Sequence, residues 1–315
     1  MWNIPGKTEI LDAAKRIQPY IHRTPVLTSS TINQMLGGEI FFKCENFQKI
    51  GAFKIRGATN VLLQLDKEQL KSGVCTHSSG NHAQAVALGA KNLGIPAYIV
   101  MPSNAPVVKQ NAVRGYGAEI TFCEPTLAAR ESTTEEIIAR TGATFIHPYD
   151  NYGIITGQAT CALELIDEVP NLDIVMAPVG GGGLLSGTAL TVHHFLPGAI
   201  TLAGEPRGAD DAYRSFKEGT FYPSVKPNTI ADGLLTSLGE RTFPIIQEHV
   251  EDILLASEEQ IKGAMRLIWE RMKIIIEPSC AVPLAALIEN NYDVKGKRVG
   301  IIITGGNVDL GKLPF

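Results

Sequence analysis

Residues 174–187 read Ile-Val-Met-Ala-Pro-Val-Gly-Gly-Gly-Gly-Leu-Leu-Ser-Gly, an apolar run followed by four glycines and a second apolar run. The first run has the length of a buried strand, and residues 184–195 have the pattern of a helix. Glycines at such a junction expose backbone N–H groups to an approaching anion. The stretch lacks the Lys-Ser/Thr of a P-loop and the spacing of GxGxxG, so a small phosphorylated cofactor fits it better than ATP or NAD. A flexible linker is the alternative, which the apolar flanks disfavour.

Short apolar strands and longer helices alternate on both sides of this stretch. On the amino-terminal side we expect a helix at 10–17, strands at 39–44, 74–76, 97–101, 119–122 and 144–146, and helices at 81–93, 107–114 and 126–140, with a polar loop at 24–30. On the carboxyl-terminal side we expect helices at 157–169, 258–272 and 279–289 and strands at 200–205 and 299–303. Such alternation predicts βαβ units and an α/β fold with two open, mainly parallel sheets flanked by helices. Ligands of these sheets bind in the cleft between them.

Composition excludes several classes of function. The 315 residues allow two packed units, because cores stop growing near ~250–300 residues. A net charge of −4 without basic runs gives no reason to expect nucleic-acid binding. No apolar run reaches the ~18 residues of a membrane helix, and the chain start lacks a secretory pattern, so we expect a cytoplasmic protein. Five cysteines without a CxxC pair predict buried, reduced thiols.

The stretch Gly51-Ala52-Phe53-Lys54-Ile55-Arg56-Gly57 sets a lysine beside an aromatic ring where a loop becomes a helical pattern. An amine held near apolar surface loses part of its preference for the charged form, so it can condense with a carbonyl. Lys54 is therefore a candidate Schiff-base lysine. A solvated lysine at a helix start is the alternative.

Three further turns carry polar groups. Residues 76–82 (Thr-His-Ser-Ser-Gly-Asn-His) end a strand and begin a helix, so they can receive a carboxylate as well as cap the helix. Thr304 follows the last strand, the usual address for a cofactor contact. Residues 205–211 are acidic and offer oxygen ligands to Mg²⁺ or Ca²⁺, although a solvated acidic loop has the same pattern.

Together these stretches resemble the fold-type II pyridoxal-phosphate enzymes (tryptophan synthase β-like), and among them the serine racemase and serine/threonine dehydratase family. The matching motifs follow one another in order along nearly the whole chain: 51–57, 78–82, 180–183, 205–211, 229–233, 277–279 and 305–309. The resemblance implies a large cofactor-binding domain at 1–68 and 149–315 and a small mobile domain at 69–148.

The resemblance also implies roles for individual residues. Lys54 would hold the cofactor aldehyde and act as the base on one face of the substrate Cα, and Ser79 would be the acid/base on the other face. Thr304 would face the pyridine nitrogen and leave it largely unprotonated. The other implied cofactor contacts are Phe53, Asn81, Gly180, Gly181, Gly182, Gly183 and Leu184.

Substrate and metal contacts follow from the same resemblance. The substrate carboxylate pocket would comprise Ser78, Ser79, Asn81 and His82. Arg130 matches a position that can face a second substrate carboxylate, or it is an exposed helix arginine. A divalent cation, Mg²⁺ or else Ca²⁺ or Mn²⁺, would be held by Glu205, Asp211 and the Ala209 carbonyl. Family members are homodimers, and some bind ATP, which the resemblance implies as an activator.

The resemblance thus implies a racemase of serine that also eliminates water from small β-hydroxy amino acids. The alternatives are an L-threonine/L-serine ammonia-lyase and a 3-hydroxyaspartate dehydratase. Tyr149 stands where vertebrate racemases carry asparagine, which leaves the balance between the two reactions open. A catalytically silent sensor on the same fold is disfavoured by the intact lysine, serine and glycine set.

Overall fold

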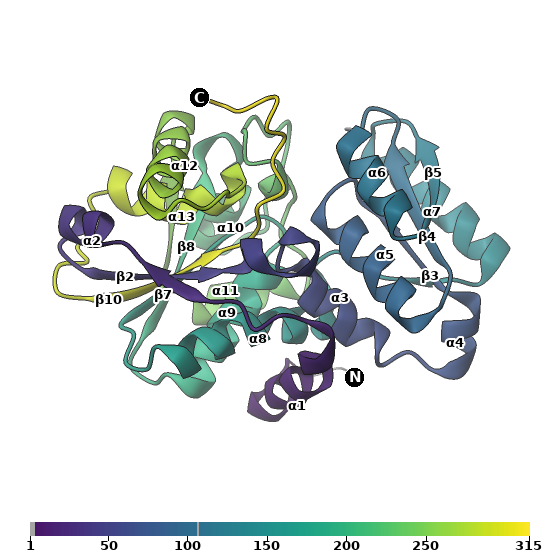
Figure 1. Ribbon diagram of the computed structural model, residues 1–315, viewed down its shortest axis with the longest axis horizontal. Helices are drawn as coiled ribbons and strands as arrows, with labels where there is room; N and C mark the ends of the chain where they lie inside the picture. Colours follow the sequence, from purple (N-terminus) through teal and green to yellow (C-terminus); the bar gives the residue numbers. More distant parts are fainter. Residues whose placement is uncertain (1–3, 106) are drawn as a thin grey trace.

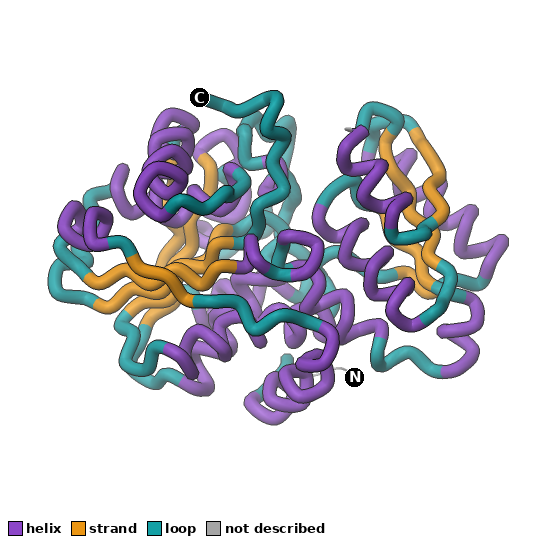
Figure 2. Tube along the Cα trace, viewed as in Figure 1, coloured by secondary structure: helices purple, strands orange, loops and turns teal. Residues whose placement is uncertain are grey.

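The computed structural model describes residues 4–105 and 107–315, and their strands form two separate sheets (Figures 1 and 2). The larger sheet has the strand order β1-β2-β10-β7-β8-β9, and the smaller has the order β5-β4-β3-β6. All of these neighbours run parallel except β1 and β2. The predicted α/β architecture with two mainly parallel sheets is confirmed.

The larger sheet is covered by helices on both faces. Its strands are β1 (Val26–Thr28), β2 (Glu39–Cys44), β7 (Ile174–Pro178), β8 (Ile200–Pro206), β9 (Asp252–Ala256) and β10 (Arg298–Ile303). The helices of this lobe are α1 (Lys7–Ile17), α2 (Ser30–Leu36), α3 (Lys54–Leu62), α8 (Tyr152–Glu168), α9 (Gly183–Phe195), α10 (Asp211–Glu218), α11 (Thr242–His249), α12 (Glu258–Met272) and α13 (Pro278–Glu289). In Figure 1, α12 and α13 lie on one face and α8 and α9 on the other. Burial on both faces explains why β7 and β10 are almost wholly apolar.

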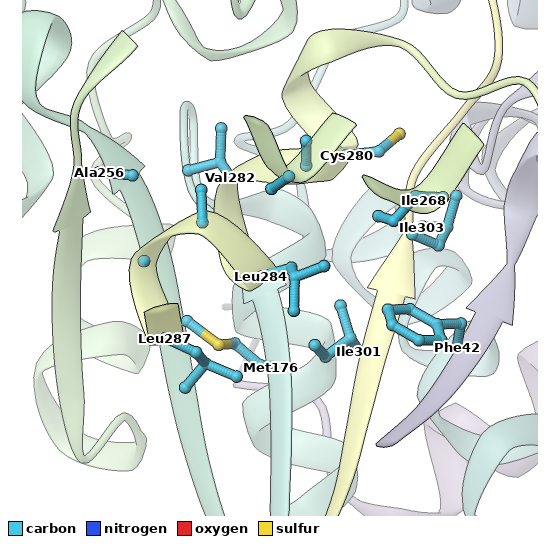
Figure 3. Packing of buried hydrophobic residues seen from close by; sticks show 14 of the residues in the cluster. Phe42, Met176, Ala256, Ile268, Cys280, Val282, Leu284, Leu287, Ile301 and Ile303 are labelled. Atoms are coloured by element: carbon cyan, nitrogen blue, oxygen red, sulfur yellow. The ribbon is translucent and has the colours of Figure 1, made fainter. Parts of the chain in front are cut away.

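The core of this lobe lies between α13 and the central strands. Met176 on β7, Leu284 on α13 and Ile301 on β10 belong to one buried cluster (Figure 3). Each of these side chains is 0% exposed. This packing fixes the carboxyl ends of β7 and β10, where two of the predicted cofactor contacts begin.

The smaller sheet carries helices on both faces as well. Its strands are β3 (Val74–His77), β4 (Ala97–Pro102), β5 (Glu119–Cys123) and β6 (Thr144–Phe145). Its helices are α4 (Lys67–Ser72), α5 (Asn81–Leu93), α6 (Val107–Gly115) and α7 (Leu127–Thr141). Figure 1 shows α5 on the side that faces α3, and α7 on the opposite face.

Some elements differ from the sequence prediction. Residues 26–28, expected in a polar loop, form the edge strand β1, antiparallel to β2. Helix α8 begins at Tyr152 and not at 157, because the Asn151 side chain accepts hydrogen bonds from the Gly153 and Ile154 N–H groups and caps it there. Strand β9 and helices α4, α10 and α11 were not predicted. Each has only five to eight residues, too few for a clear period.

All five cysteines are unpaired, and four of them are buried, as the composition predicted. Within residues 4–105 and 107–315, no helix is long and apolar enough to cross a membrane.

A buried network of ion pairs ties α3 to the larger sheet. Arg56 on α3 donates two hydrogen bonds to Glu45, at 2.7 and 2.8 Å, and two to Glu164 on α8, both at 2.8 Å. Lys43 on β2 donates to the same Glu164 at 2.7 Å. The side chains of Arg56, Glu45 and Lys43 are 0% exposed, and the paired charges compensate for their desolvation. The network therefore fixes the start of α3.

Replacing Glu45 with alanine is expected to lower the free energy of unfolding by about 3 kcal/mol, because Arg56 keeps its buried charge and loses two of its bonds. The matched control is Glu39→Ala, which breaks the exposed pair between Glu39 and Arg298 and should cost at most about 1 kcal/mol. Urea unfolding of the purified variants measures both. Equal losses would contradict a stabilising role for the network.

Candidate active site

Lys54 is the first residue of α3, and Phe53 directly precedes it. The Lys54 amine donates a hydrogen bond to the Pro148 carbonyl oxygen at 2.8 Å and lies 5.3 Å from the centre of the Phe53 ring. Desolvation lowers the pKa of Lys54 to about 8, and the nearby Glu277 carboxylate opposes part of this shift. Roughly one tenth of such an amine is neutral at pH 7, so it can act as a nucleophile.

The four glycines form a bend between β7 and α9. Gly183 is the first residue of α9, and Gly182 has φ +86°, which favours glycine. Among the described residues, no acceptor contacts the N–H groups of Gly180 to Gly183 or of Leu184. Five free N–H groups at a helix start form a site for an anion such as a phosphate.

Tyr149 connects the lysine to this glycine bend. It directly follows Pro148, whose carbonyl oxygen accepts from Lys54. A side chain at Gly181 would collide with the Tyr149 ring, so glycine is required for this close packing. Sequence reasoning noted Tyr149 only as a departure from the family pattern and missed this contact.

Thr304 follows β10 and is 3% exposed. Its carbonyl oxygen accepts a hydrogen bond from the Phe53 N–H at 3.0 Å, which joins the end of β10 to the lysine loop. Phe53 packs in one buried cluster with Leu184. The lysine loop, the glycine bend and the end of β10 therefore meet in one place, although they are far apart in sequence.

Asn81 is the first residue of α5, and both ends of its side chain are bonded. Its amide nitrogen donates to the two Glu277 oxygens at 2.9 and 3.2 Å, and its carbonyl oxygen accepts from Asn307 at 2.8 Å. Both contacts of the amide nitrogen go to one carboxylate, and an amide NH2 has two protons, so a second N–H of Asn81 is available for the predicted bond to a cofactor oxygen.

Glu277 is a buried carboxylate that sequence reasoning did not select, although its Glu-Pro-Ser motif was quoted. It precedes α13 and is 5% exposed. Burial, and secondly the charge of Asp232, raises the pKa of Glu277 to about 7, and the hydrogen bond from Asn81 opposes this. The sequence signal that could have singled out Glu277 is an acidic residue directly before an apolar helix that begins with proline.

The turn after β3 contributes Ser78, Ser79 and His82. The Ser78 hydroxyl accepts from the Gly80 N–H at 3.3 Å, and the half-buried Ser79 hydroxyl has no partner among the described residues. His82 is 3% exposed, and its Nε2 lies 3.0 Å from the Ile146 carbonyl oxygen while its buried Nδ1 has no partner there. Burial, and secondly the charge of Lys54, lowers the pKa of His82 to about 3. The ring is therefore neutral.

Arg130 lies in the first turn of α7 and is half-buried. Its Nε donates to the Thr126 carbonyl oxygen at 3.4 Å. Its charge, after burial, is the second cause of the lowered pKa of His77, the residue before Ser78. The Arg130 charge thus acts on the strand end from which the serine turn begins.

The acidic loop after β8 contains the predicted cation ligands. Both Glu205 oxygens accept backbone N–H groups, from Ala212 at 2.9 Å and Tyr213 at 2.7 Å, while Asp211 has one buried oxygen without a partner in the described part of the chain. Burial raises the pKa of Asp211 to about 6. In residues 4–105 and 107–315, no group of three or more His, Cys, Asp or Glu side chains lies close enough together to hold a metal ion. Two carboxylates and the Ala209 carbonyl still match the oxygen ligands of Mg²⁺ or Ca²⁺.

These residues fit pyridoxal phosphate. The free N–H groups from Gly180 to Leu184 suit its phosphate, and the Lys54 amine, with its lowered pKa, suits its aldehyde. The buried Thr304 hydroxyl suits its ring nitrogen.

The comparison with known families agrees with this geometry. The family described as "Pyridoxal-phosphate dependent enzyme" matches residues 17–305. The chain belongs to this family of pyridoxal-phosphate dependent enzymes.

Known relatives are similar over nearly the full length. A serine racemase from Dictyostelium discoideum is 53% identical, with 97% of this chain and 95% of the relative covered. A beta-hydroxyaspartate dehydratase from Paracoccus denitrificans is 50% identical, with 99% of each covered. The crystal structure of the Dictyostelium serine racemase aligns with a TM-score of 0.94 at 52% identity, covering 98% of this chain and 100% of the other.

The pKa of Lys54 predicts the pH dependence of its reactivity. Labelling of Lys54 in the cofactor-free protein by pyridoxal, trapped with borohydride and mapped by peptide analysis, should rise with pH to a half-maximum near pH 8 and level off above about pH 9. The reason is that the neutral amine is the nucleophile, and it is half formed at its pKa and almost fully formed one pH unit above it. Labelling that still rises steeply above pH 9 would contradict the lowered pKa.

Proposed function

We propose that this chain racemises serine and eliminates water from serine, using pyridoxal phosphate. The observation that carries the proposal is the Lys54 amine, which has a pKa near 8 and donates a hydrogen bond to the Pro148 carbonyl oxygen. The next residue, Tyr149, packs on the glycine bend whose N–H groups are free. Two relatives, named serine racemase and beta-hydroxyaspartate dehydratase, are 53% and 50% identical over nearly the whole chain. They support small β-hydroxy amino acids as the class of substrate.

Pyridoxal phosphate, when bound, supplies an electron sink that acidifies the substrate Cα–H. Lys54 removes or returns this proton on one face of Cα, for which a pKa near 8 is well matched. The Ser79 hydroxyl, free of other partners among the described residues, handles the proton on the opposite face. Return of a proton from Ser79 gives the other enantiomer of serine. Loss of the β-hydroxyl gives, after hydrolysis, an α-keto acid and ammonia.

The remaining residues bind and orient. The N–H groups from Gly180 to Leu184 would hold the phosphate, Phe53 would pack against the ring, and the second N–H of the Asn81 amide would bond the ring oxygen. Ser78, Ser79, Asn81 and the neutral His82 form the pocket for the substrate carboxylate. The Thr304 hydroxyl faces the ring nitrogen.

A 3-hydroxyaspartate dehydratase is the second candidate. Arg130 lies near His77 at the end of the strand that leads to the serine turn, so it is positioned to attract a second carboxylate. The relative from Paracoccus denitrificans bears the name of such an enzyme. Activity on 3-hydroxyaspartate that depends on Arg130 would favour a 3-hydroxyaspartate dehydratase over a serine racemase.

We further infer a large domain at 1–68 and 149–315 and a small mobile domain at 69–148. Support comes from the separate small sheet and from polar links between the lobes, such as Lys109 to Asp232 at 2.6 Å. A divalent cation, Mg²⁺ or else Ca²⁺ or Mn²⁺, at Glu205, Ala209 and Asp211 would support activity. The homodimer, activation by ATP and a cytoplasmic location stay predictions.

A substrate panel tests the function directly. Purified protein with pyridoxal phosphate is given L-serine, D-serine, L-threonine and the 3-hydroxyaspartate isomers, with and without Mg²⁺, and keto acids and enantiomers are measured. We expect the opposite serine enantiomer and pyruvate, both lost at least 1,000-fold in Lys54→Ala because no other amine in the site can replace it. Turnover that survives in Lys54→Ala, or no turnover of either serine enantiomer by the unaltered protein, would refute the proposal.

Replacing Ser79 with alanine should separate the two reactions. Racemisation of L-serine should fall by about 100-fold or more, because the proton on the far face has lost its carrier. Elimination from L-serine should fall much less, since Lys54 removes that proton. Chiral analysis and keto-acid release, measured on the same samples, give the ratio. An equal loss of both rates would refute the assignment of Ser79 to the second face.

A further inference from the structure

The thiol of Cys280 meets the hydroxyl that faces the cofactor in the proposed function. Cys280 is the third residue of α13, and its sulfur lies 3.1 Å from Thr304 Oγ1. The sulfur is also 2.8 Å from the Gly305 carbonyl oxygen and 3.0 Å from the Gly305 N–H nitrogen. Among the described residues, Thr304 Oγ1 has no other hydrogen-bond partner. In Figure 3 the sulfur lies at the upper edge of the cluster, beyond Ile303 of β10.

The chemistry of the neighbours fixes where the protons lie. Burial raises the pKa of the Cys280 thiol well above its usual range, so the thiol carries its proton. The Gly305 carbonyl oxygen can only accept, and the Gly305 N–H can only donate. The thiol proton therefore points at the carbonyl oxygen, because otherwise two lone pairs would face each other at 2.8 Å. The sulfur then has no proton to give to Thr304 and can only accept from it.

We propose that Cys280 is a positioning residue that keeps the Thr304 hydroxyl available as a proton donor to the ring nitrogen of the cofactor. The sulfur is a weak acceptor, so it holds the Thr304 proton loosely. An unprotonated pyridine nitrogen accepts more strongly and takes the hydrogen bond over. A hydroxyl at position 280 would compete, because its oxygen accepts strongly and its proton can turn toward Thr304. The inference rests on the proposed function.

A double-mutant cycle tests the coupling between the two residues. The variants are Cys280→Ser, Thr304→Val and the double variant, and the measured quantity is the dissociation constant of pyridoxal phosphate for each cofactor-free protein. We expect Cys280→Ser alone to weaken binding about fivefold, the size of one net hydrogen bond. In the Thr304→Val background the same change should have less than a twofold effect.

A packing control and a spectrum separate hydrogen bonding from structure. Cys280→Ala offers neither a proton nor an acceptor, so it should keep the affinity within about twofold. The visible absorption bands of the bound cofactor should shift in Cys280→Ser and stay unchanged when Thr304→Val is already present. Equal effects of Cys280→Ser in both backgrounds, or an equal loss in Cys280→Ala, would overturn the inference.

A measurement on the unaltered protein keeps the test decisive if a variant does not fold. With ¹⁵N-labelled pyridoxal phosphate, the chemical shift of the ring nitrogen should be that of an unprotonated, hydrogen-bonded pyridine. A protonated ring nitrogen would need an acceptor from Thr304 and would overturn the inference while leaving the proposed function intact. Borohydride trapping that leaves no tag on Lys54 would refute the proposed function and the inference together.

Discussion

The four bonds from Arg56 to Glu45 and Glu164 are the interaction on which the rest of the site depends. Arg56 lies two residues after Lys54 on the same helix and has no exposed surface. Its two carboxylate partners come from the segment after β2 and from α8, so three segments are held at one point. Bidentate pairing fixes direction as well as distance, which a hydrophobic contact does not. The start of α3, and with it the Lys54 amine, is thereby held against the larger sheet.

The ion pairs of Arg56 allow the Lys54 side chain to be kept partly out of water. A long, charged side chain next to Phe53 and the Pro148 carbonyl loses hydration, which lowers the pKa of Lys54 and costs stability. The cost is tolerated because the surrounding segments are fixed by other interactions, the Arg56 network and the hydrogen bond from Phe53 to Thr304 among them. Reactivity at Lys54 is thus connected to the stability of the lobe around it.

Polar side chains connect the two lobes across the site. Asn81 begins a helix of the smaller sheet, whereas Glu277 and Asn307 belong to the larger lobe. The Glu277 carboxylate has a pKa near 7, so its charge depends on the partners that reach it. Hydrogen bonds from Asn81 to Glu277 and from Asn307 to Asn81 therefore join the two lobes directly beside the site.

The sequence alone determined the class of fold and the chemistry. Apolar strands alternating with helices predicted the parallel sheets, and Lys54, the glycines 180–183, Thr304 and the 78–82 turn were selected as candidate site residues, because these signals are local in the chain. The short strands β1 and β9 were not predicted, since so few residues show no clear hydrophobic periodicity.

Only the tertiary structure decided which of these residues meet and what holds them. It brought Tyr149 onto Gly181, buried Glu277 beside Asn81 and set Cys280 against Thr304. It also lowered the pKa of Lys54. These contacts join segments up to about two hundred residues apart, and both desolvation and hydrogen-bond direction depend on all neighbours in space. No pattern within a single segment contains that information.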